Sequence, residues 1–161
     1  MLVDQLYYAA RAARIAALAK DWSEVVADAG LPASVNGQGL RIGYHAACSL
    51  QHGQRVDAPR ALLVAAGFDV VQPADAHLCC GSAGTYNILQ SELAGALRDR
   101  KLAALNATGA TVVASGNIGC LTQLAGDRLA LVHSAELLDW ATGGPRPVAL
   151  PATFAAPLPA A

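Results

Sequence analysis

Residues 111–120 read TVVASGNIGC, a short apolar segment followed by a glycine-containing loop that ends in a cysteine. The segment from Thr111 to Ser115 is rich in β-branched and apolar residues, a composition typical of a buried strand in a parallel sheet. Glycine and asparagine, which favour turns, follow at once. The stretch therefore predicts a buried strand whose carboxyl end leads directly into a loop carrying Cys120.

The same alternation of strand, loop and helix recurs on both sides of this stretch. LRIGYH at 40–45, FDVVQP at 68–73 and LALVH at 129–133 predict three further strands. Helices are expected near 57–67, 88–107, from about 121, and over 134–141. Strands that alternate with helices form right-handed crossovers and a parallel sheet. The sequence therefore predicts an α/β fold: a single Rossmann-like domain with a parallel sheet of about four strands flanked by helices.

A chain of 161 residues has the length of one domain with a sizeable core. Residues 1–30 are expected to form an N-terminal helix, because Ala, Leu and Val recur at helical spacing up to Gly30. The α/β core is expected at 40–144, so the domain spans 1–144. Residues 145–161 hold five of the eight prolines and are rich in alanine, so we expect a tail that packs as extended chain or is disordered.

Composition and charge exclude several classes of function. The net charge is −1, which indicates no nucleic acid partner. No apolar run approaches the roughly 18 residues of a transmembrane helix. The opening sequence MLVDQLYYAARAAR also lacks the pattern of a signal peptide, so we expect a cytoplasmic protein. In that compartment four cysteines indicate metal binding or catalysis rather than structural disulfides.

All four cysteines follow predicted strands. Cys48 follows the first strand, Cys79 and Cys80 follow the second, and Cys120 follows the third. None is predicted to lie inside a helix or strand, where a structural thiol is more often buried. The carboxyl ends of parallel strands share one edge of the sheet, where α/β proteins bind ligands. We therefore expect the four thiols to gather at this edge as metal ligands.

Four thiolates suit either a tetrahedral zinc ion or an iron–sulfur cluster. Structural zinc is usually bound by C-x-x-C pairs, which this sequence lacks. The adjacent sulfurs of Cys79 and Cys80 are poorly placed to bind one ion together, but they can reach two irons of a larger cluster. The pair therefore favours an iron–sulfur cluster, with [4Fe-4S] as the expected type and zinc as the alternative.

Residues beside the cysteines are candidates for cofactor binding. Gly81 and Gly119 allow the backbone to approach the site closely and offer N–H groups. His45 is a candidate ligand or a donor to a ligand, although a strand-end histidine bonded to the backbone is the commoner role. The charge run from Arg98 to Lys101 is interpreted as a solvated helix face.

The segments around the cysteines resemble those of a known family. They read YHAACSLQHGQ, CCGSAGTYNILQSELAGALRDRK, SGNIGCLTQLA and VHSAELLDWATGG. In this order and spacing they resemble the CCG cysteine-rich domain found in the C-terminal part of glycolate oxidase iron–sulfur subunits. The cysteine-rich subunit of heterodisulfide reductase and the lactate-utilisation iron–sulfur proteins are similar as well.

The resemblance implies a function in electron transfer. In that family a flavin subunit oxidises a 2-hydroxy acid such as glycolate, and the iron–sulfur subunit passes the electrons toward the respiratory chain. The implied partners are the flavin subunit and the other iron–sulfur domains of the same complex. The chain is then the electron-transfer part of an oxidoreductase rather than a complete enzyme, and it meets the inner face of the membrane only through the complex.

Two features depart from the family's pattern. The fuller pattern ends in C-x-x-C, whereas the first of these positions is Asn117 here. Asn117 is a candidate weak ligand, a hydrogen-bond donor to the cluster or a turn residue, and the turn role is the commonest for asparagine. The ferredoxin-type cysteine motifs and the second cysteine-rich domain of the whole subunit are also not in this sequence.

Two alternatives remain open from the residues alone. The first is a docking module whose cysteines hold zinc or no metal. The second is a thiol redox catalyst similar to heterodisulfide reductase, in which the region of Cys79 and Cys80 reacts directly. The second alternative requires at least one thiol with a low pKa that alkylates rapidly.

Overall fold

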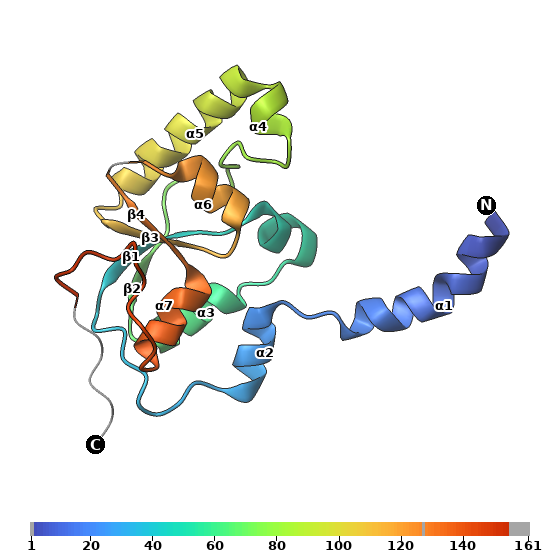
Figure 1. The fold of residues 1–161 in the computed structure, drawn as a ribbon, viewed down its shortest axis with the longest axis horizontal. Helices are drawn as coiled ribbons and strands as arrows, with labels where there is room; N and C mark the ends of the chain where they lie inside the picture. Colours follow the sequence, from blue (N-terminus) through green and yellow to red (C-terminus); the bar gives the residue numbers. More distant parts are fainter. Residues whose placement is uncertain (1, 127, 155–161) are drawn as a thin grey trace.

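A parallel sheet of four strands lies at the centre of the computed structural model, which describes residues 2–126 and 128–154, and helices cover both of its faces (Figure 1). The strand order is β2-β1-β3-β4 and every pairing is parallel. The strands are β1 (Arg41–His45), β2 (Asp69–Val71), β3 (Val112–Ser115) and β4 (Ala130–His133). The predicted α/β fold with a parallel sheet is therefore confirmed.

The helices connect the strands and flank the sheet. They are α1 (Leu2–Leu18), α2 (Trp22–Ala29), α3 (Ala58–Ala65), α4 (Tyr86–Leu89), α5 (Ser91–Asn106), α6 (Ile118–Leu124) and α7 (Ser134–Ala141), with a π-helical segment at Ser49–Gln54. The single helix expected at 88–107 is divided at Gln90, whose backbone leaves the helical region (φ −129°, ψ 52°). Over the described ranges, no helix combines the length and apolar character needed to cross a membrane.

Two hydrophobic cores lie on opposite faces of the sheet. One packs against α3 and α7 and contains Val112 together with Trp140, while the other packs against α5 and α6 and contains Val113 together with Leu105. The adjacent residues Val112 and Val113 enter different cores because successive side chains of a strand point to opposite faces. Both are fully buried. This double burial explains why the segment at 111–115 is apolar throughout.

The connections of the sheet change direction between β1 and β3. The chain leaves β1 through α3 and reaches β2 on one side, whereas it leaves β3 through α6 and reaches β4 on the other side. The crevice outside the carboxyl ends of two such strands is the usual ligand site of doubly wound α/β proteins. The fold therefore places this crevice at the ends of β1 and β3, where His45 pairs with Ser115.

The N-terminal helix predicted for 1–30 is present in two pieces. Asp21 has an extended backbone and accepts a hydrogen bond from the Ser23 N–H, while the Glu24 carboxylate accepts one from the Asp21 N–H. This capping box starts a new helix, α2, because it satisfies N–H groups that have no partner inside a helix. Helix α1 projects away from the sheet, and only α2 lies against the body of the domain (Figure 1).

The start of the tail packs through turns rather than as an extended segment. Leu150 is buried in the core on the α7 side, and Phe154 packs against the same core. The Arg146 guanidinium donates a hydrogen bond to the Leu150 carbonyl oxygen. The remainder of the predicted tail, 155–161, lies outside the described residues.

The interpretation of Arg98–Lys101 as a solvated face is wrong for Lys101. Its side chain is fully buried, and its Nζ donates hydrogen bonds to the carbonyl oxygens of Asp75 (3.1 Å) and Ala76 (3.2 Å). Burial lowers the pKa of Lys101, because a charged group loses hydration in the interior. Lys101 therefore ties the middle of α5 to the loop that leads into Cys79.

Replacing Lys101 by methionine should destabilise the domain. The Lys101→Met variant removes the side-chain donor to the Asp75 carbonyl oxygen and leaves the Ala76 carbonyl oxygen with only the longer bond from Gln51, which costs about 1–3 kcal/mol of unfolding free energy. Arg100→Met is the matched control, because Arg100 contacts the same Asp75 through an exposed ion pair of 2.9 Å. The control should lose less than about 1 kcal/mol. Urea denaturation measures both, and equal stability of Lys101→Met and the parent protein would contradict this role.

Candidate metal centre

One pocket of about 390 Å³ at the carboxyl edge of the sheet is lined by all four cysteines. Its lining comprises Cys48, Ser49, Cys79, Cys80, Ser82, Ala83, Gly84, Asn117, Gly119 and Cys120. Cys80 and Cys120 are buried, at 1% and 6% exposure, whereas Cys48 and Cys79 are half-buried. The structure thus brings together thiols that are up to 72 positions apart in the sequence, from Cys48 to Cys120.

Cys120 lies inside a helix, contrary to the prediction that every cysteine sits in a loop. It is the third residue of α6, which begins directly after Asn117. The Asn117 side-chain oxygen accepts a hydrogen bond of 3.2 Å from the Cys120 N–H. Asn117 is therefore the helix cap that orients Cys120, a role for which asparagine is among the preferred residues.

Gly81 allows the adjacent cysteine pair to pack against α5. Its backbone has φ +91°, and a Cβ atom at this position would lie only 2.5 Å from the Ala94 carbonyl oxygen. The Gly81 N–H donates a hydrogen bond of 3.3 Å to the Cys79 sulfur. The N–H group expected of this glycine donates to a cysteine sulfur, whereas the close approach that glycine permits is to the backbone of α5. A side chain at position 81 would push the cysteine pair away from the helix.

Gly119 lies where two of the cysteine segments meet. A Cβ atom here would lie 2.9 Å from Ser82 Oγ and 3.0 Å from Asn117 Oδ1. A side chain at this position would therefore displace the Ser82 or Asn117 side chain, so glycine favours the close approach of α6 to the loop after Cys80. This close approach is one reason why Cys80 and Cys120 face the same pocket.

The loop before Cys79 is tied to two other parts of the chain. Gln51 Nε2 donates hydrogen bonds to the carbonyl oxygens of Ala46 (2.7 Å) and Ala76 (3.4 Å), so it joins the Cys48 segment to this loop. Lys101 donates to Ala76 from the other side. Sequence reasoning missed both positioning residues, because each acts across at least 25 positions on a backbone carbonyl that no motif marks.

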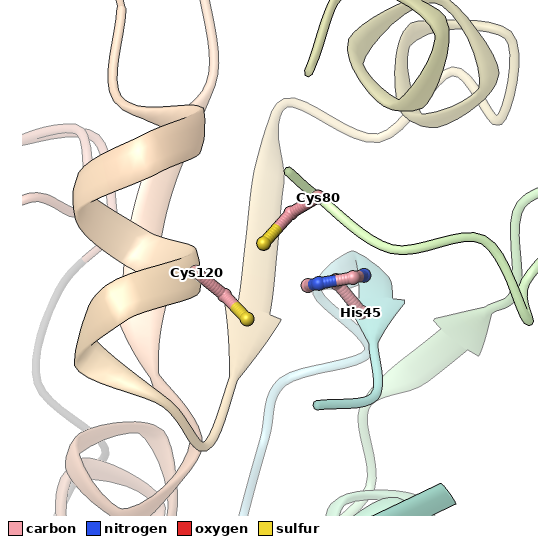
Figure 2. Close-up of side chains that lie close together, drawn as sticks. All are labelled: His45, Cys80 and Cys120. Carbon is pink, nitrogen blue, oxygen red and sulfur yellow. The ribbon is translucent and has the colours of Figure 1, made fainter. Parts of the chain in front are cut away.

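His45 is buried beside two of the cysteines. It is 1% exposed, and neither ring nitrogen has a hydrogen-bond partner among the residues that the structure describes. The backbone hydrogen bond expected of a strand-end histidine is therefore not found. Figure 2 shows the His45 ring beside the Cys80 and Cys120 side chains, and the potential ligand atoms of the three residues all lie within 4.8 Å of one another.

The thiols perturb one another's ionisation. The Cys120 thiol, acting as a hydrogen-bond donor, holds the pKa of Cys80 well below its ordinary value, with smaller contributions from His45 and the backbone at Ser82. The same interaction with Cys80, together with burial, raises the pKa of Cys120. Burial and the neighbouring Cys79 thiol raise the pKa of Cys48 to about 11. Without a cation, these groups cannot all carry negative charge in one pocket.

This donor set fits a thiophilic metal or an iron–sulfur cluster. Soft thiolate ligands select zinc and iron–sulfur centres, and metal binding requires the thiols to be deprotonated. A bound cation relieves the repulsion among the thiolates, and it offers a partner to the imidazole nitrogens of His45 that have none among the described residues. The side chains in this pocket are therefore better explained as ligands suited to a metal centre than as four protonated thiols without a metal.

Comparison with known proteins places these features in a family. The model of the CCG family, described as "Cysteine-rich domain", matches residues 42–125, a range that contains His45 and all four cysteines. The chain is 34% identical over 143 residues to the "Glycolate oxidase iron-sulfur subunit" of Escherichia coli (strain K12), which covers 88% of this chain and 35% of that protein.

Two other relatives are also similar to this chain over only part of their own length. The "Probable glycolate oxidase iron-sulfur subunit" of Bacillus subtilis (strain 168) is 35% identical over 114 residues, covering 63% of this chain and 25% of that protein. "Lactate utilization protein A" of Geobacillus kaustophilus (strain HTA426) is 29% identical over 143 residues, covering 81% of this chain and 58% of that protein.

The chain thus spans only a quarter to about a third of the two glycolate oxidase relatives, and just over half of the third relative. The matched range includes most of β1, the adjacent cysteine pair and α6, and so covers the segments that form the pocket. The resemblance expected from the cysteine segments is confirmed, and the chain belongs to the CCG cysteine-rich domain family.

Proposed function

We propose that this chain is an iron–sulfur electron-transfer domain of a complex that oxidises a 2-hydroxy acid such as glycolate. The observation that carries the proposal is the single pocket at the β1–β3 crevice that all four cysteines line. The two relatives named as glycolate oxidase iron–sulfur subunits support both the cofactor and the substrate class. The flavin chemistry belongs to another subunit, from which this domain passes electrons toward the respiratory chain.

In this proposal Cys48, Cys79, Cys80 and Cys120 are the ligands of the cluster. A bound [4Fe-4S] cluster supplies a one-electron carrier, whose potential depends on hydrogen bonds to sulfur and on exposure. The Gly81 N–H, which donates to the Cys79 sulfur, is such a hydrogen bond. Cys80 and Cys120 are buried away from water, whereas Cys48 and Cys79 are partly exposed, which makes them the cysteines nearer to an approaching redox partner.

The pKa values of the thiols argue against the alternative of a thiol redox catalyst. A reactive cysteine needs both a lowered pKa and access to its substrate. Cys80 has the lowered pKa but is only 1% exposed, whereas the more accessible Cys48 has a raised pKa. The two requirements are thus divided between different residues. The alternative of a docking module requires either zinc or no metal in the pocket. The metal content of the protein therefore distinguishes it from the proposed iron–sulfur domain.

Protein purified anaerobically should contain about four irons and four sulfides per chain, with visible absorbance that bleaches on reduction. The Cys80→Ser variant should lose most of this iron, because a hydroxyl is a poor substitute for a buried thiolate ligand. Ser82→Ala is the matched control, since Ser82 lines the same pocket without offering a thiolate. Iron, sulfide and zinc analysis measures the outcome. Stoichiometric zinc, or no metal after anaerobic reconstitution, would support the docking alternative instead.

The four thiols should resist alkylation until the metal is removed. Iodoacetamide treatment of the anaerobic native protein, followed by mass spectrometry, should leave Cys48, Cys79, Cys80 and Cys120 unmodified, because ligated thiolates are not free nucleophiles. The same treatment after chelation and denaturation should modify all four. Rapid modification of one cysteine in iron-loaded protein, without iron loss, would favour the thiol catalyst.

Within the intact complex, Cys80→Ser should separate flavin chemistry from electron delivery. Extracts carrying the variant should retain 2-hydroxy-acid oxidation with a dye that accepts electrons directly from the flavin. Reduction of a quinone acceptor should fall by an order of magnitude or more, because the electron path is interrupted. Ser82→Ala again serves as the control. Unchanged quinone reduction by a variant shown to lack iron would contradict electron transfer through this domain.

A further inference from the structure

Lys101 is a buried cationic side chain without a carboxylate partner. It is fully buried, and its Nζ donates hydrogen bonds to the carbonyl oxygens of Asp75 and Ala76, which are neutral acceptors. No carboxylate in the described parts of the chain forms an ion pair with it, and the Asp75 carboxylate pairs instead with Arg100 at 2.9 Å. Lysine is almost never buried completely unless a group of opposite charge is paired with it. The burial of Lys101 therefore indicates a counter-charge other than a carboxylate.

The negative charges that act on Lys101 come mainly from the cysteines. Burial lowers the pKa of Lys101, because it removes water from around the ammonium group. Four groups oppose this shift through their negative charges, namely Cys48, Cys80, Asp75 and Cys79. The influence is mutual, since the charge of Lys101 counteracts the rise in the pKa of Cys48 that burial and the neighbouring thiols cause. Lys101 is thus linked electrostatically to three of the four thiols of the pocket.

The contacts of Lys101 place it behind the cysteine loop rather than in the pocket. The carbonyl oxygens that it binds belong to the loop that continues from Ala76 to Cys79. The next residue of α5, Leu102, packs against the hydrophobic core that contains Cys80. Lys101 is not part of the pocket lining, and an ammonium group has no lone pair with which to bind a metal. Its influence on the site is therefore exerted by its charge and not by ligation.

We propose that the Lys101 ammonium group is the buried counter-charge of the metal centre and that it raises the reduction potential of this centre. The proposal rests on the proposed function of the four cysteines as cluster ligands. Four thiolates outweigh the positive charge of the inorganic core, so the centre is an anion, and one electron received from the flavin subunit adds one further negative charge. A fixed positive charge nearby stabilises the reduced form more than the oxidised form. Lys101 keeps its proton while the electron arrives and leaves.

Burial makes this effect larger than that of a cation on the surface. Charges in the interior are screened by water and salt much less than exposed charges are. Arg100, the residue before Lys101, is also cationic, but its side chain is 63% exposed and is paired with Asp75. The two neighbouring residues of α5 therefore offer a matched comparison between a buried and an exposed positive charge.

The test compares Lys101→Gln with Lys101→Arg in the full chain, purified anaerobically, with the midpoint potential of the visible absorbance as the readout. Glutamine keeps an N–H donor for the two carbonyl oxygens but removes the charge, whereas arginine keeps both. The potential should fall in Lys101→Gln and stay close to that of the parent protein in Lys101→Arg. The control Arg100→Gln should leave it unchanged, because water screens the exposed charge.

The outcomes separate the role of the charge from the role of packing. An unchanged potential in Lys101→Gln, or equal shifts in Lys101→Gln and Lys101→Arg, would overturn the proposal while leaving the cluster in place. Iron loss from Lys101→Gln alone would support it, because an anionic centre would then depend on the positive charge. Iron loss from both variants would overturn it, since packing rather than charge would then hold the site.

Two further measurements complete the experiment. Urea denaturation shows whether each variant folds, and Lys101→Met, which also lacks the charge, takes the place of Lys101→Gln if that variant is unfolded. Iron and sulfide analysis of the parent protein tests the function on which the proposal rests. Parent protein that binds neither iron nor sulfide would overturn the cluster and the counter-charge together.

Discussion

The parallel pairing of β1 with β3 is the constraint on which the site depends. Its register aligns Ile42 with Val112 and continues to the last residues, where His45 lies beside Ser115. Because the connections that follow β1 and β3 leave in opposite directions, a crevice opens between the carboxyl ends of these two strands. The two central strands are buried on both faces, so the positions of their carboxyl ends are fixed by packing. The segments that carry Cys48 and Cys120 begin at these ends.

The segments that carry the cysteines are held by contacts of different kinds. Asn117 caps the helix that presents Cys120, Gly81 permits close contact with α5, and Gln51 and Lys101 meet at the Ala76 carbonyl oxygen. Each contact fixes backbone rather than a sulfur atom directly. The thiols held in this way are preorganised, so that less conformational entropy would be lost if a metal binds in the proposed site.

The electrostatics of the pocket agree with a cationic occupant. The pKa of Cys80 is lowered chiefly by a hydrogen bond from the Cys120 thiol, and this interaction raises the pKa of Cys120, so the protein by itself favours a thiolate at one of the two cysteines. Lys101 lies near enough for the charges of Cys48 and Cys80 to raise its pKa, although burial lowers it more strongly. Binding of the proposed metal would therefore require deprotonation of the remaining thiols, as is usual for thiolate sites.

The amino-acid sequence by itself determined the α/β class, the four strands and the segments that bring the thiols to one edge. These features follow from local composition: β-branched runs form buried strands, glycine and asparagine mark turns, and parallel strands share their carboxyl edge. The Asp21–Glu24 capping box that divides the N-terminal helix is equally a local pattern, although the prediction of one helix over 1–30 overlooked it.

Only the tertiary structure decided that Lys101 and His45 are buried. On a helix with charged neighbours, Lys101 has the pattern of a solvated residue, and its burial depends on a loop that begins about 25 positions earlier. His45 has the pattern of any polar residue at the end of a strand, and its isolation beside Cys80 and Cys120 arises where three distant segments meet. Local patterns report which backbone forms, whereas burial and hydrogen-bond partners depend on packing between segments far apart in the chain.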